Sequence, residues 1–272
     1  MHSEAQKPSV VIVGTIRNGT RSLIRDIKRL DAATAGFGRR TYFVVESDSS
    51  DGTVRMLEAL SAKRSDFNFR SFGQLASEMP LRTQRLAFCR NACIEFVFTS
   101  PERHDFVLVA DLDNINDGIN EEGLMSCFAI DQKWDVCTAN RFGRYYDVFA
   151  LRCDDWVEDD CFAALDRLGQ KLDRAVARKL LVEGKMITIP PEHPAIEVKS
   201  AFAGLALYRQ EVYVSSRYEG LTADGREVCE HVAFHAGITS NGGKILINPR
   251  MQAGGRPEFG GKNLLRMLFR RA

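Results

Sequence analysis

Two aspartates that directly follow an apolar run near the middle of the chain could bind a metal ion. The run spans Phe106 to Ala110 and ends in Asp111-Leu112-Asp113. It is typical of a buried strand in a mostly parallel sheet, where alternate residues share a face, so Asp111 and Asp113 lie together. Adjacent carboxylates repel each other, and a divalent cation that bridges them to a phosphate removes the repulsion. Two aspartates that cap a turn would give the same pattern.

The stretch before this pair alternates strands and helices. Strands are predicted at 9–13, 41–45, 67–72 and 106–110, and amphipathic helices at 22–30, 54–62 and 81–98. This order favours an α/β fold with a doubly wound, mostly parallel sheet flanked by helices. Such sheets bind ligands at the carboxyl ends of their strands, which is where the polar residues of this stretch collect.

The second half is less regular. We predict strands at 136–140, 198–208 and 244–247, a long amphipathic helix at 162–182 and a helix at 228–239. The Pro190–Pro194 segment cannot be helical. Gly204 lies inside a predicted strand, where a ligand or another backbone can approach closely. We expect a single domain, 1–272, with a nucleotide-binding half at about 9–114, an acceptor and metal half at 115–250 and a basic tail at 251–272.

Composition excludes some classes of function. The 272 residues are 44% hydrophobic and 27% charged, and the net charge of +1 gives no overall field that favours nucleic acid or a membrane. The seven cysteines form no C-x-x-C pattern, which indicates a reducing cytoplasm. The first nine residues lack the apolar core of a signal peptide, and no apolar run approaches the ~18 residues of a membrane span.

The carboxyl-terminal tail has its own charge pattern. From Arg250 to Ala272 it carries six basic residues against Glu258, interspersed with leucines, methionine and phenylalanine. It could form a basic amphipathic helix that lies on an anionic membrane surface, or a frayed or core-docked terminal helix. We therefore expect a cytoplasmic protein, with the tail as a candidate for peripheral contact with the inner face of the membrane.

Polar residues close the first two predicted strands. Thr15, Arg17 and Asn18 could hold a nucleobase or ribose, with Arg17 reaching phosphate, although a plain turn would look similar. Glu46 could accept hydrogen bonds from a ribose or base, while the segment 48–51 caps the next helix. The chain lacks G-x-G-x-x-G and Walker A loops, which argues against dinucleotide enzymes and P-loop NTPases.

Two further groups could take part in chemistry. Arg85 and Arg90 lie on the predicted helix 81–98 and suit a pyrophosphate, or form a solvated face. His231 and His235 are four residues apart at the start of a late helix, but H-E-x-x-H is absent. One histidine serving the same metal as Asp113 is the more natural arrangement. The neighbouring Glu230 could be a base or could orient an acceptor.

Taken in order, these pieces resemble the GT-A class of nucleotide-sugar glycosyltransferases, and look like bacterial polysaccharide enzymes related to capsule mannosyltransferases. The resemblance covers residues 10 to 250, and the ordered set carries it rather than any single piece. The matching pieces are Gly14-Thr-Ile-Arg-Asn18, Glu46-Ser-Asp-Ser-Ser-Asp-Gly-Thr53, Arg90-Asn91, Ala110-Asp-Leu-Asp-Asn114, Tyr145-Tyr-Asp-Val-Phe-Ala-Leu-Arg152, Phe202-Ala-Gly-Leu-Ala-Leu-Tyr208 and Cys229-Glu-His-Val-Ala-Phe-His235.

The resemblance implies a nucleoside-diphosphate sugar as donor, with Mn²⁺ or Mg²⁺ across its pyrophosphate. Asp113 would ligate the metal, Asp111 would contact ribose or metal, and His235 would complete the coordination. The residues expected to contact the nucleotide sugar are Thr15, Arg17, Asn18, Glu46, Arg85, Arg90, Asp111 and Leu112. Those expected near the acceptor or donor sugar are Tyr146, Asp147, the Pro190–Pro194 loop with His193, and Gly204.

The catalytic base stays open at this point. An inverting transferase needs a carboxylate base beside the acceptor hydroxyl, whereas a retaining enzyme needs none. Many inverting relatives carry a Glu-Asp pair where this chain has Glu230-His231. Glu230, His231 and Asp147 are therefore all candidates.

The function implied is transfer of a sugar to a glycan or lipid-linked glycan acceptor in surface polysaccharide synthesis. A sugar nucleotidyltransferase is an alternative, but Gly14 to Arg21 is a poor version of its glycine-rich loop. A non-catalytic nucleotide- or sugar-binding module would not need Asp111 and Asp113. A glycoside hydrolase is the weakest alternative, because carboxylates two residues apart fit a cation better than the two sides of a sugar ring.

Overall fold

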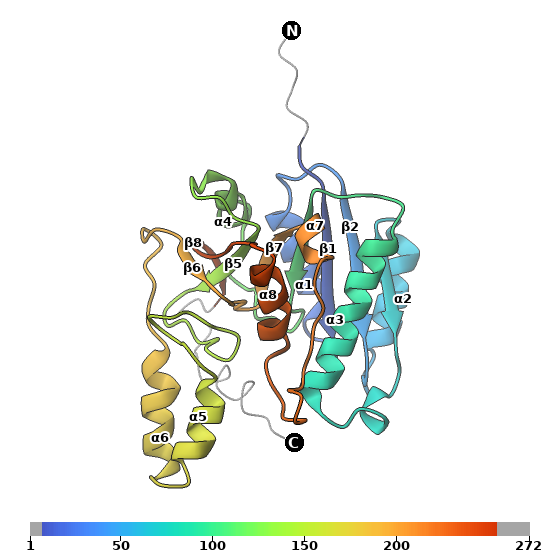
Figure 1. The fold of residues 1–272 in the computed structure, drawn as a ribbon. Coiled ribbons are helices and arrows are strands. Elements are labelled where there is room, and N and C mark those ends of the chain that lie inside the picture. Colours follow the sequence, from blue (N-terminus) through green and yellow to red (C-terminus); the bar gives the residue numbers. More distant parts are fainter. Residues whose placement is uncertain (1–6, 255–272) are drawn as a thin grey trace.

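The computed structural model describes residues 7–254 as one open sheet of eight strands with helices on both faces (Figure 1). The strand order is β3-β2-β1-β4-β7-β5-β8-β6. The strands are β1 (Val10–Ile16), β2 (Arg40–Glu46), β3 (Phe67–Ser71), β4 (Phe106–Ala110), β5 (Val136–Arg141), β6 (Ile196–Val198), β7 (Leu205–Arg209) and β8 (Ile245–Gly254).

Helices cover the sheet because its strands are apolar on both faces; β4, for example, is buried throughout. The α-helices are α1 (Leu23–Ala33), α2 (Thr53–Lys63), α3 (Arg82–Thr99), α4 (Glu121–Met125), α5 (Cys161–Leu168), α6 (Arg174–Leu181), α7 (Gln210–Tyr213) and α8 (Glu230–Ser240). Short 3-10 turns are η1 (Leu75–Ser77), η2 (Ser126–Ala129) and η3 (Glu183–Lys185). Helices α1 and α2 pack on one face and α3 and α8 on the other.

The sheet divides into two sets of strands that follow the order of the chain. The first set, β3-β2-β1-β4, is entirely parallel. In the second set, β5 and β8 are parallel, while β7 runs antiparallel to both β4 and β5 and β6 runs antiparallel to β8. The prediction of a mostly parallel α/β sheet is confirmed. The carboxyl ends of β1, β2, β4 and β5 lie at one edge, the lower edge in Figure 1.

The predicted long helix at 162–182 is wrong, because the structure has α5 and α6 instead. Helix α5 ends before Gly169, and the Asp173 carboxylate caps α6 by accepting hydrogen bonds from the backbone amides of Ala175 and Val176. Glycine and aspartate favour helix ends, and here they outweigh the continuous apolar period. The two helices form a hairpin that projects beyond the lower edge of the sheet (Figure 1).

Two strand predictions also need correction. The strand predicted at 198–208 is interrupted, because Ala203 and Gly204 have φ angles of 57° and 92° and turn the chain between β6 and β7. The last strand continues past residue 247 to Gly254, with register shifts opposite Asn140. The first residues of the predicted basic tail therefore belong to β8. The rest of that tail lies outside the described residues.

Candidate active site at the carboxyl edge of the sheet

Asp111 and Asp113 follow β4 at the carboxyl edge. The Asp111 side chain is 28% exposed, and Asp113 is exposed. The backbone between them is fixed: the Asp111 amide donates to the Gly204 carbonyl at 2.9 Å, and the Ser22 hydroxyl donates to the Leu112 carbonyl at 2.9 Å. The Leu112 side chain is buried in the core. The two carboxylates are thus held on a rigid turn where a ligand can reach them.

The surroundings of Asp113 disfavour its charged form. Desolvation by the surrounding protein raises its pKa to about 7, and the charges of Asp111 and Asp26 add to the shift. Asp26 is itself buried on α1 and accepts a hydrogen bond from the Asn114 amide at 2.9 Å. A cation at this edge would offset the repulsion among these carboxylates.

Arg90 links Asp111 to the second half of the chain. This residue of α3 is 4% exposed. Its Nη2 donates to Asp111 Oδ1 and its Nε donates to Glu230 Oε1, both at 2.9 Å. The guanidinium also faces the rings of Phe202 at 5.1 Å and Tyr218 at 5.9 Å. Arg90 was expected to contact a pyrophosphate directly. In this structure its buried guanidinium instead bridges the carboxylates of Asp111 and Glu230.

Glu230 and His231 begin α8 beside this bridge. Glu230 is 4% exposed and is paired with Arg90. His231 is 2% exposed and stacks on Phe202 with ring centroids 3.8 Å apart. Desolvation lowers the pKa of His231 well below its ordinary value, and the Arg90 charge adds to this effect. Neither ring nitrogen has a hydrogen-bond partner within residues 7–254. His231 is therefore a neutral packing group in this conformation.

His235, the expected third metal ligand, lies in the core in this structure. Its Nδ1 lies 3.0 Å from the Ser200 hydroxyl and its Nε2 lies 2.8 Å from the Tyr208 hydroxyl, so both ring nitrogens are engaged. The residue is fully buried, and desolvation lowers its pKa to about 3. In the described part of the chain, no three His, Cys, Asp or Glu side chains are placed to hold a metal ion together. The spacing of His231 and His235 reflects core packing of α8.

Asp147 supports the turn beneath Asp111. Its Oδ2 accepts a hydrogen bond from the Ala203 amide at 2.9 Å, and its Oδ1 accepts one from the Ala150 amide at 3.4 Å. Burial raises the pKa of Asp147 to about 6. Gly204 follows Ala203 in the chain, and its carbonyl accepts the hydrogen bond from the Asp111 amide. A Cβ added at Gly204 would lie 2.9 Å from Ile115 Cγ2. A side chain at residue 204 is thus disfavoured both by the φ of 92° and by the nearby side chains of Ile115 and Asn116.

One residue that supports this turn escaped the sequence analysis. The Asn116 side-chain amide donates to the carbonyls of Asp111 at 2.9 Å and Gly204 at 3.0 Å. It is 3% exposed. Its two partners are five and 88 residues away, so no local periodicity could have revealed it. The available signal was a side-chain amide three residues after the Asp111-Leu112-Asp113 motif.

The loop after β1 is tied to the loop after β2. Arg17 is exposed, and its Nε donates to the Asp48 carbonyl at 3.2 Å. Asn18 has a φ of 53°, and its Oδ1 accepts a hydrogen bond from the Ser50 amide at 2.8 Å. Thr15 is partly exposed at the end of β1. These hydrogen bonds hold the loops after β1 and β2 together at the carboxyl edge of the sheet.

Two of the expected nucleotide contacts are occupied within the protein. Glu46 is 1% exposed, and its oxygens accept hydrogen bonds from the Ser49 amide at 2.9 Å and from the Ser71 hydroxyl. Arg85 donates from one nitrogen to the carbonyls of Met79 at 2.6 Å and Pro80 at 2.8 Å. Both residues hold loops at the carboxyl edge in this conformation rather than facing a ligand.

The expected acceptor residues lie in different settings. Tyr146 is 8% exposed and packs under the Arg141 guanidinium, which is 4.8 Å from its ring centroid. His193 is exposed on the loop before β6, and its Nδ1 lies 2.7 Å from the Pro194 carbonyl. Tyr146 and Asp147 follow β5, so they share the carboxyl edge with Asp111. The structure records no contact that brings His193 to that group among the described residues.

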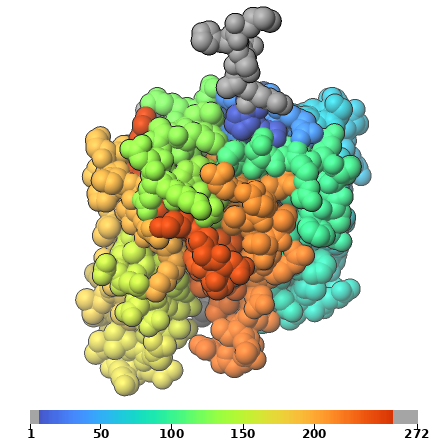
Figure 2. Space-filling view, turned by 45° about the horizontal axis from the view of Figure 1, so that its top comes forward, coloured from blue at the N-terminus to red at the C-terminus, as the bar shows by residue number. Residues whose placement is uncertain are grey.

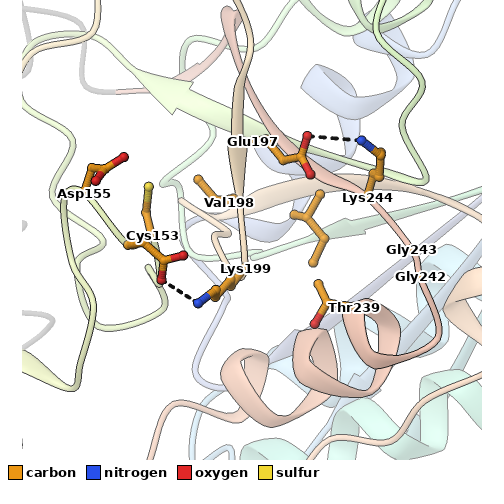
Figure 3. A pocket seen from close by; sticks show the side chains of 11 residues that line it. Cys153, Asp155, Glu197, Val198, Lys199, Thr239, Gly242, Gly243 and Lys244 are labelled. Carbon is orange, nitrogen blue, oxygen red and sulfur yellow. Dashed lines mark hydrogen bonds and ion pairs between the residues drawn. The ribbon is translucent and has the colours of Figure 1, made fainter.

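A pocket of about 420 Å³ lies elsewhere (Figure 3). It is lined in part by Val198 and Ile245, which pair with each other at the amino-terminal end of β8. Because β8 is parallel to β5, this is the edge of the sheet opposite Asp111. Two of its lysines are ion-paired within the pocket, Lys199 with Asp154 and Lys244 with Glu197. The pocket is therefore separate from the candidate site.

The residues at the carboxyl edge suit a hard divalent cation. Carboxylate oxygens are the ligands that Mg²⁺ and Mn²⁺ prefer, and Mg²⁺ commonly takes one or two carboxylates and completes its shell with water and substrate phosphates. Asp111 and Asp113 provide two such groups, both reached by solvent. This donor set fits a cation held jointly by the protein and a diphosphate.

Two solved structures were compared with this chain, and the first, with a TM-score above 0.5, shares its fold. The mannosyltransferase PcManGT from Pyrobaculum calidifontis, solved with GDP-Man and Mn²⁺, is 12% identical, with a TM-score of 0.51 over 96% of this chain and 60% of that one. S. aureus TarS 1-349 in complex with UDP-GlcNAc is 16% identical, with a TM-score of 0.49 over 92% of this chain and 59% of that one. Neither a protein-family model nor a curated protein sequence matches the chain.

The chain has the GT-A fold. The fold that the sequence resemblance implied is thereby confirmed at the level of architecture. The chain spans about 60% of the length of the PcManGT structure. At 12% identity, the match speaks for the fold and leaves activity to be argued from the site.

Proposed function

We propose that this chain is a metal-dependent glycosyltransferase. It transfers a sugar from a nucleoside-diphosphate sugar to a glycan or lipid-linked glycan acceptor in surface polysaccharide synthesis. The observation that carries the proposal is the pair Asp111 and Asp113 on a rigid turn at the carboxyl edge of a GT-A sheet. The seven cysteines, all free, support a cytoplasmic location.

Asp111 and Asp113 would hold Mn²⁺ or Mg²⁺ together with the donor diphosphate. When bound, the cation would supply Lewis-acid stabilisation of the charge that develops on the leaving diphosphate. Arg90 orients the Asp111 carboxylate through its hydrogen bond of 2.9 Å. The exposed Arg17 lies at the end of the neighbouring strand β1, where its guanidinium could bind a phosphate oxygen. Thr15 and Asn18 would line the nucleoside side of the same edge.

Glu230 is our candidate for the base that takes the proton from the acceptor hydroxyl. It begins α8, and Arg90 holds one of its carboxylate oxygens at 2.9 Å, which fixes the direction of the side chain. His231 is neutral and packed against Phe202, and Asp147 is committed to two backbone amides. We therefore assign Asp147 and Gly204 to shaping the site under the donor sugar, and the neighbouring Tyr146 to the acceptor side.

Thermal stability with nucleotides tests the proposal directly. Purified protein is melted with UDP, GDP, CDP or dTDP, each with and without Mn²⁺. A ligand that binds only the folded state raises the melting temperature once its concentration exceeds its dissociation constant. We expect a rise for one nucleotide that requires the metal, and this would also identify the donor class. No rise with any of the four would count against the proposal.

The substitution Glu230→Gln distinguishes a role as catalytic base from a role in nucleotide binding. Glu230→Gln keeps the shape of the side chain and a hydrogen-bond acceptor for Arg90. We expect turnover to fall by about 10²-fold or more while the nucleotide-dependent melting shift is retained. Equal loss of turnover and nucleotide binding would show that Glu230 acts only through Arg90.

A further inference from the structure

The helical hairpin of α5 and α6 presents apolar side chains to solvent. Leu172, Val176 and Leu180 follow one another at intervals of four residues and are 47%, 49% and 60% exposed. Val176 and Leu180 lie one turn apart along one side of α6, and Leu172 precedes that helix in the turn between α5 and α6. Ile187, just beyond the hairpin, is 45% exposed. A contiguous exposed apolar strip of this kind marks an interaction surface rather than ordinary scattered exposure.

Basic residues surround this strip. Residues 161–187 contain six basic side chains against three acidic ones, whereas the segment 154–160 just before α5 contains five acidic residues. The acidic groups are already engaged: Asp166 pairs with Arg174 at 2.9 Å, Glu183 pairs with Arg178 at 3.2 Å, and Asp173 caps α6. Lys171 and Lys179 are exposed beside the apolar strip. The segment 161–187 therefore carries a net charge of +3 and adjoins the acidic segment 154–160.

We propose that the α5–α6 hairpin docks on an anionic lipid bilayer. Leu172, Val176 and Leu180 would enter the headgroup boundary, while Lys171 and Lys179 would contact acidic headgroups. A second copy of this chain suits the surface less well, because a symmetric contact would bring like charges together. This docking surface is distinct from the basic carboxyl-terminal tail, and it does not depend on the proposed transfer reaction.

The position of the hairpin determines how the candidate site would be oriented relative to the bilayer. The hairpin is inserted between β5 and β6, and the chain leaves β5 at the same edge that carries Asp111. Figure 1 shows α5 and α6 projecting past that edge, and Figure 2 shows the hairpin at the lower left of the molecule, in yellow. A docked hairpin would turn the candidate site toward the bilayer. If the proposed function holds, the acceptor would then be a glycan attached to a membrane lipid.

Vesicle partitioning of the full chain tests this proposal. The probes are phosphatidylcholine vesicles with and without phosphatidylglycerol, and the main variant is Leu180→Glu. Phe98→Glu is the matched control, because Phe98 is 58% exposed at the far end of α3 and gains the same charge. We expect salt-sensitive binding to the anionic vesicles that Leu180→Glu weakens at least about tenfold, while Phe98→Glu changes it less than about twofold. Lys171→Glu combined with Lys179→Glu should also weaken binding about tenfold.

Four results would overturn the proposal. They are equal binding of Leu180→Glu and Phe98→Glu, equal binding to vesicles with and without phosphatidylglycerol, loss of binding only when residues after Arg256 are removed, and a dimer that Leu180→Glu dissociates without any vesicle binding. The melting temperature of Leu180→Glu should match that of the parent, which excludes misfolding. Nucleotide-dependent melting shifts should also be unchanged, so failure of docking and failure of the proposed reaction can be distinguished.

Discussion

The two halves of the sheet differ in how they are connected, and the candidate site lies where they meet. In the first half, parallel strands alternate with helices, and this half supplies charged groups at fixed strand ends: Asp111, Asp113 and Arg17. In the second half, the start of helix α8 supplies Glu230, and the turn before the antiparallel strand β7 supplies Gly204. Regular architecture positions the ionic groups, while irregular backbone shapes the space around them.

The sharpest test of this division is a change to the first half alone. Asp113→Asn removes one carboxylate from an exposed position, so the fold should not change. We expect sugar transfer to fall about 10³-fold, because several kcal/mol of charge stabilisation at the leaving diphosphate depend on the cation. Asp131→Asn, at another exposed position, is the control. Full activity of Asp113→Asn at saturating Mn²⁺ would remove the assigned metal role.

The bridge between the halves can be cut at Arg90. Arg90→Met leaves Asp111 and Glu230 without their buried partner, and we expect the free energy of unfolding to fall by about 3 kcal/mol. Arg70→Met is the control, because its pair with Glu95 is exposed and should contribute less than about 1 kcal/mol. Urea denaturation measures both. Similar losses for the two variants would mean that Arg90 does not join the halves.

The second half should respond to acid through His235. Its pKa is about 3 in the folded protein and about 6.5 when unfolded, so the unfolded chain binds more protons between these values. Stability contributed by neutral His235 is therefore complete above about pH 6.5 and falls as the pH drops toward 3, by up to about 1.4 kcal/mol per pH unit. Denaturation at several pH values should show a weaker acid dependence in His235→Gln than in the parent. His193→Gln, at an exposed position, should leave the dependence unchanged.

The smallest expected effects concern the turn between β6 and β7. Gly204→Ala places a Cβ at a φ of 92° and 2.9 Å from Ile115 Cγ2, which should destabilise the protein by about 1–3 kcal/mol. Ala203→Gly relieves a φ of 57° and should change stability by less than about 1 kcal/mol. Thermal melting compares the two directly. Equal effects would show that the turn is flexible rather than imposed by its surroundings.

The sequence predicted the first half well because its signals are local. Each strand is a short apolar run and each helix has a clear period, so the predicted bounds of β1 to β4 and α1 to α3 agree with the structure within three residues. Asp111 and Asp113 were found because they follow such a run. The break at Gly169 and the turn at Gly204 were missed, because apolar periodicity continues across both.

The candidate site itself depended on contacts that no pattern reveals. Arg90 reaches Glu230 across 140 residues, and His235 turns its two nitrogens to Ser200 and Tyr208. From sequence, a buried arginine on an amphipathic helix is indistinguishable from an exposed one that binds phosphate. The same ambiguity holds for His235, since only tertiary packing determines which partners its ring nitrogens meet.

The pairing of β4 with β7 has a consequence for how the chain folds. It joins Phe106 to Arg209, about 100 residues apart, whereas β1 and β2 pair across about 30. Closing the longer loop costs more chain entropy, and distant pairings form late. The first four strands could therefore assemble during synthesis, before β7 exists. On refolding, helical content should return ahead of nucleotide binding, because the site is completed only when the last third of the chain docks.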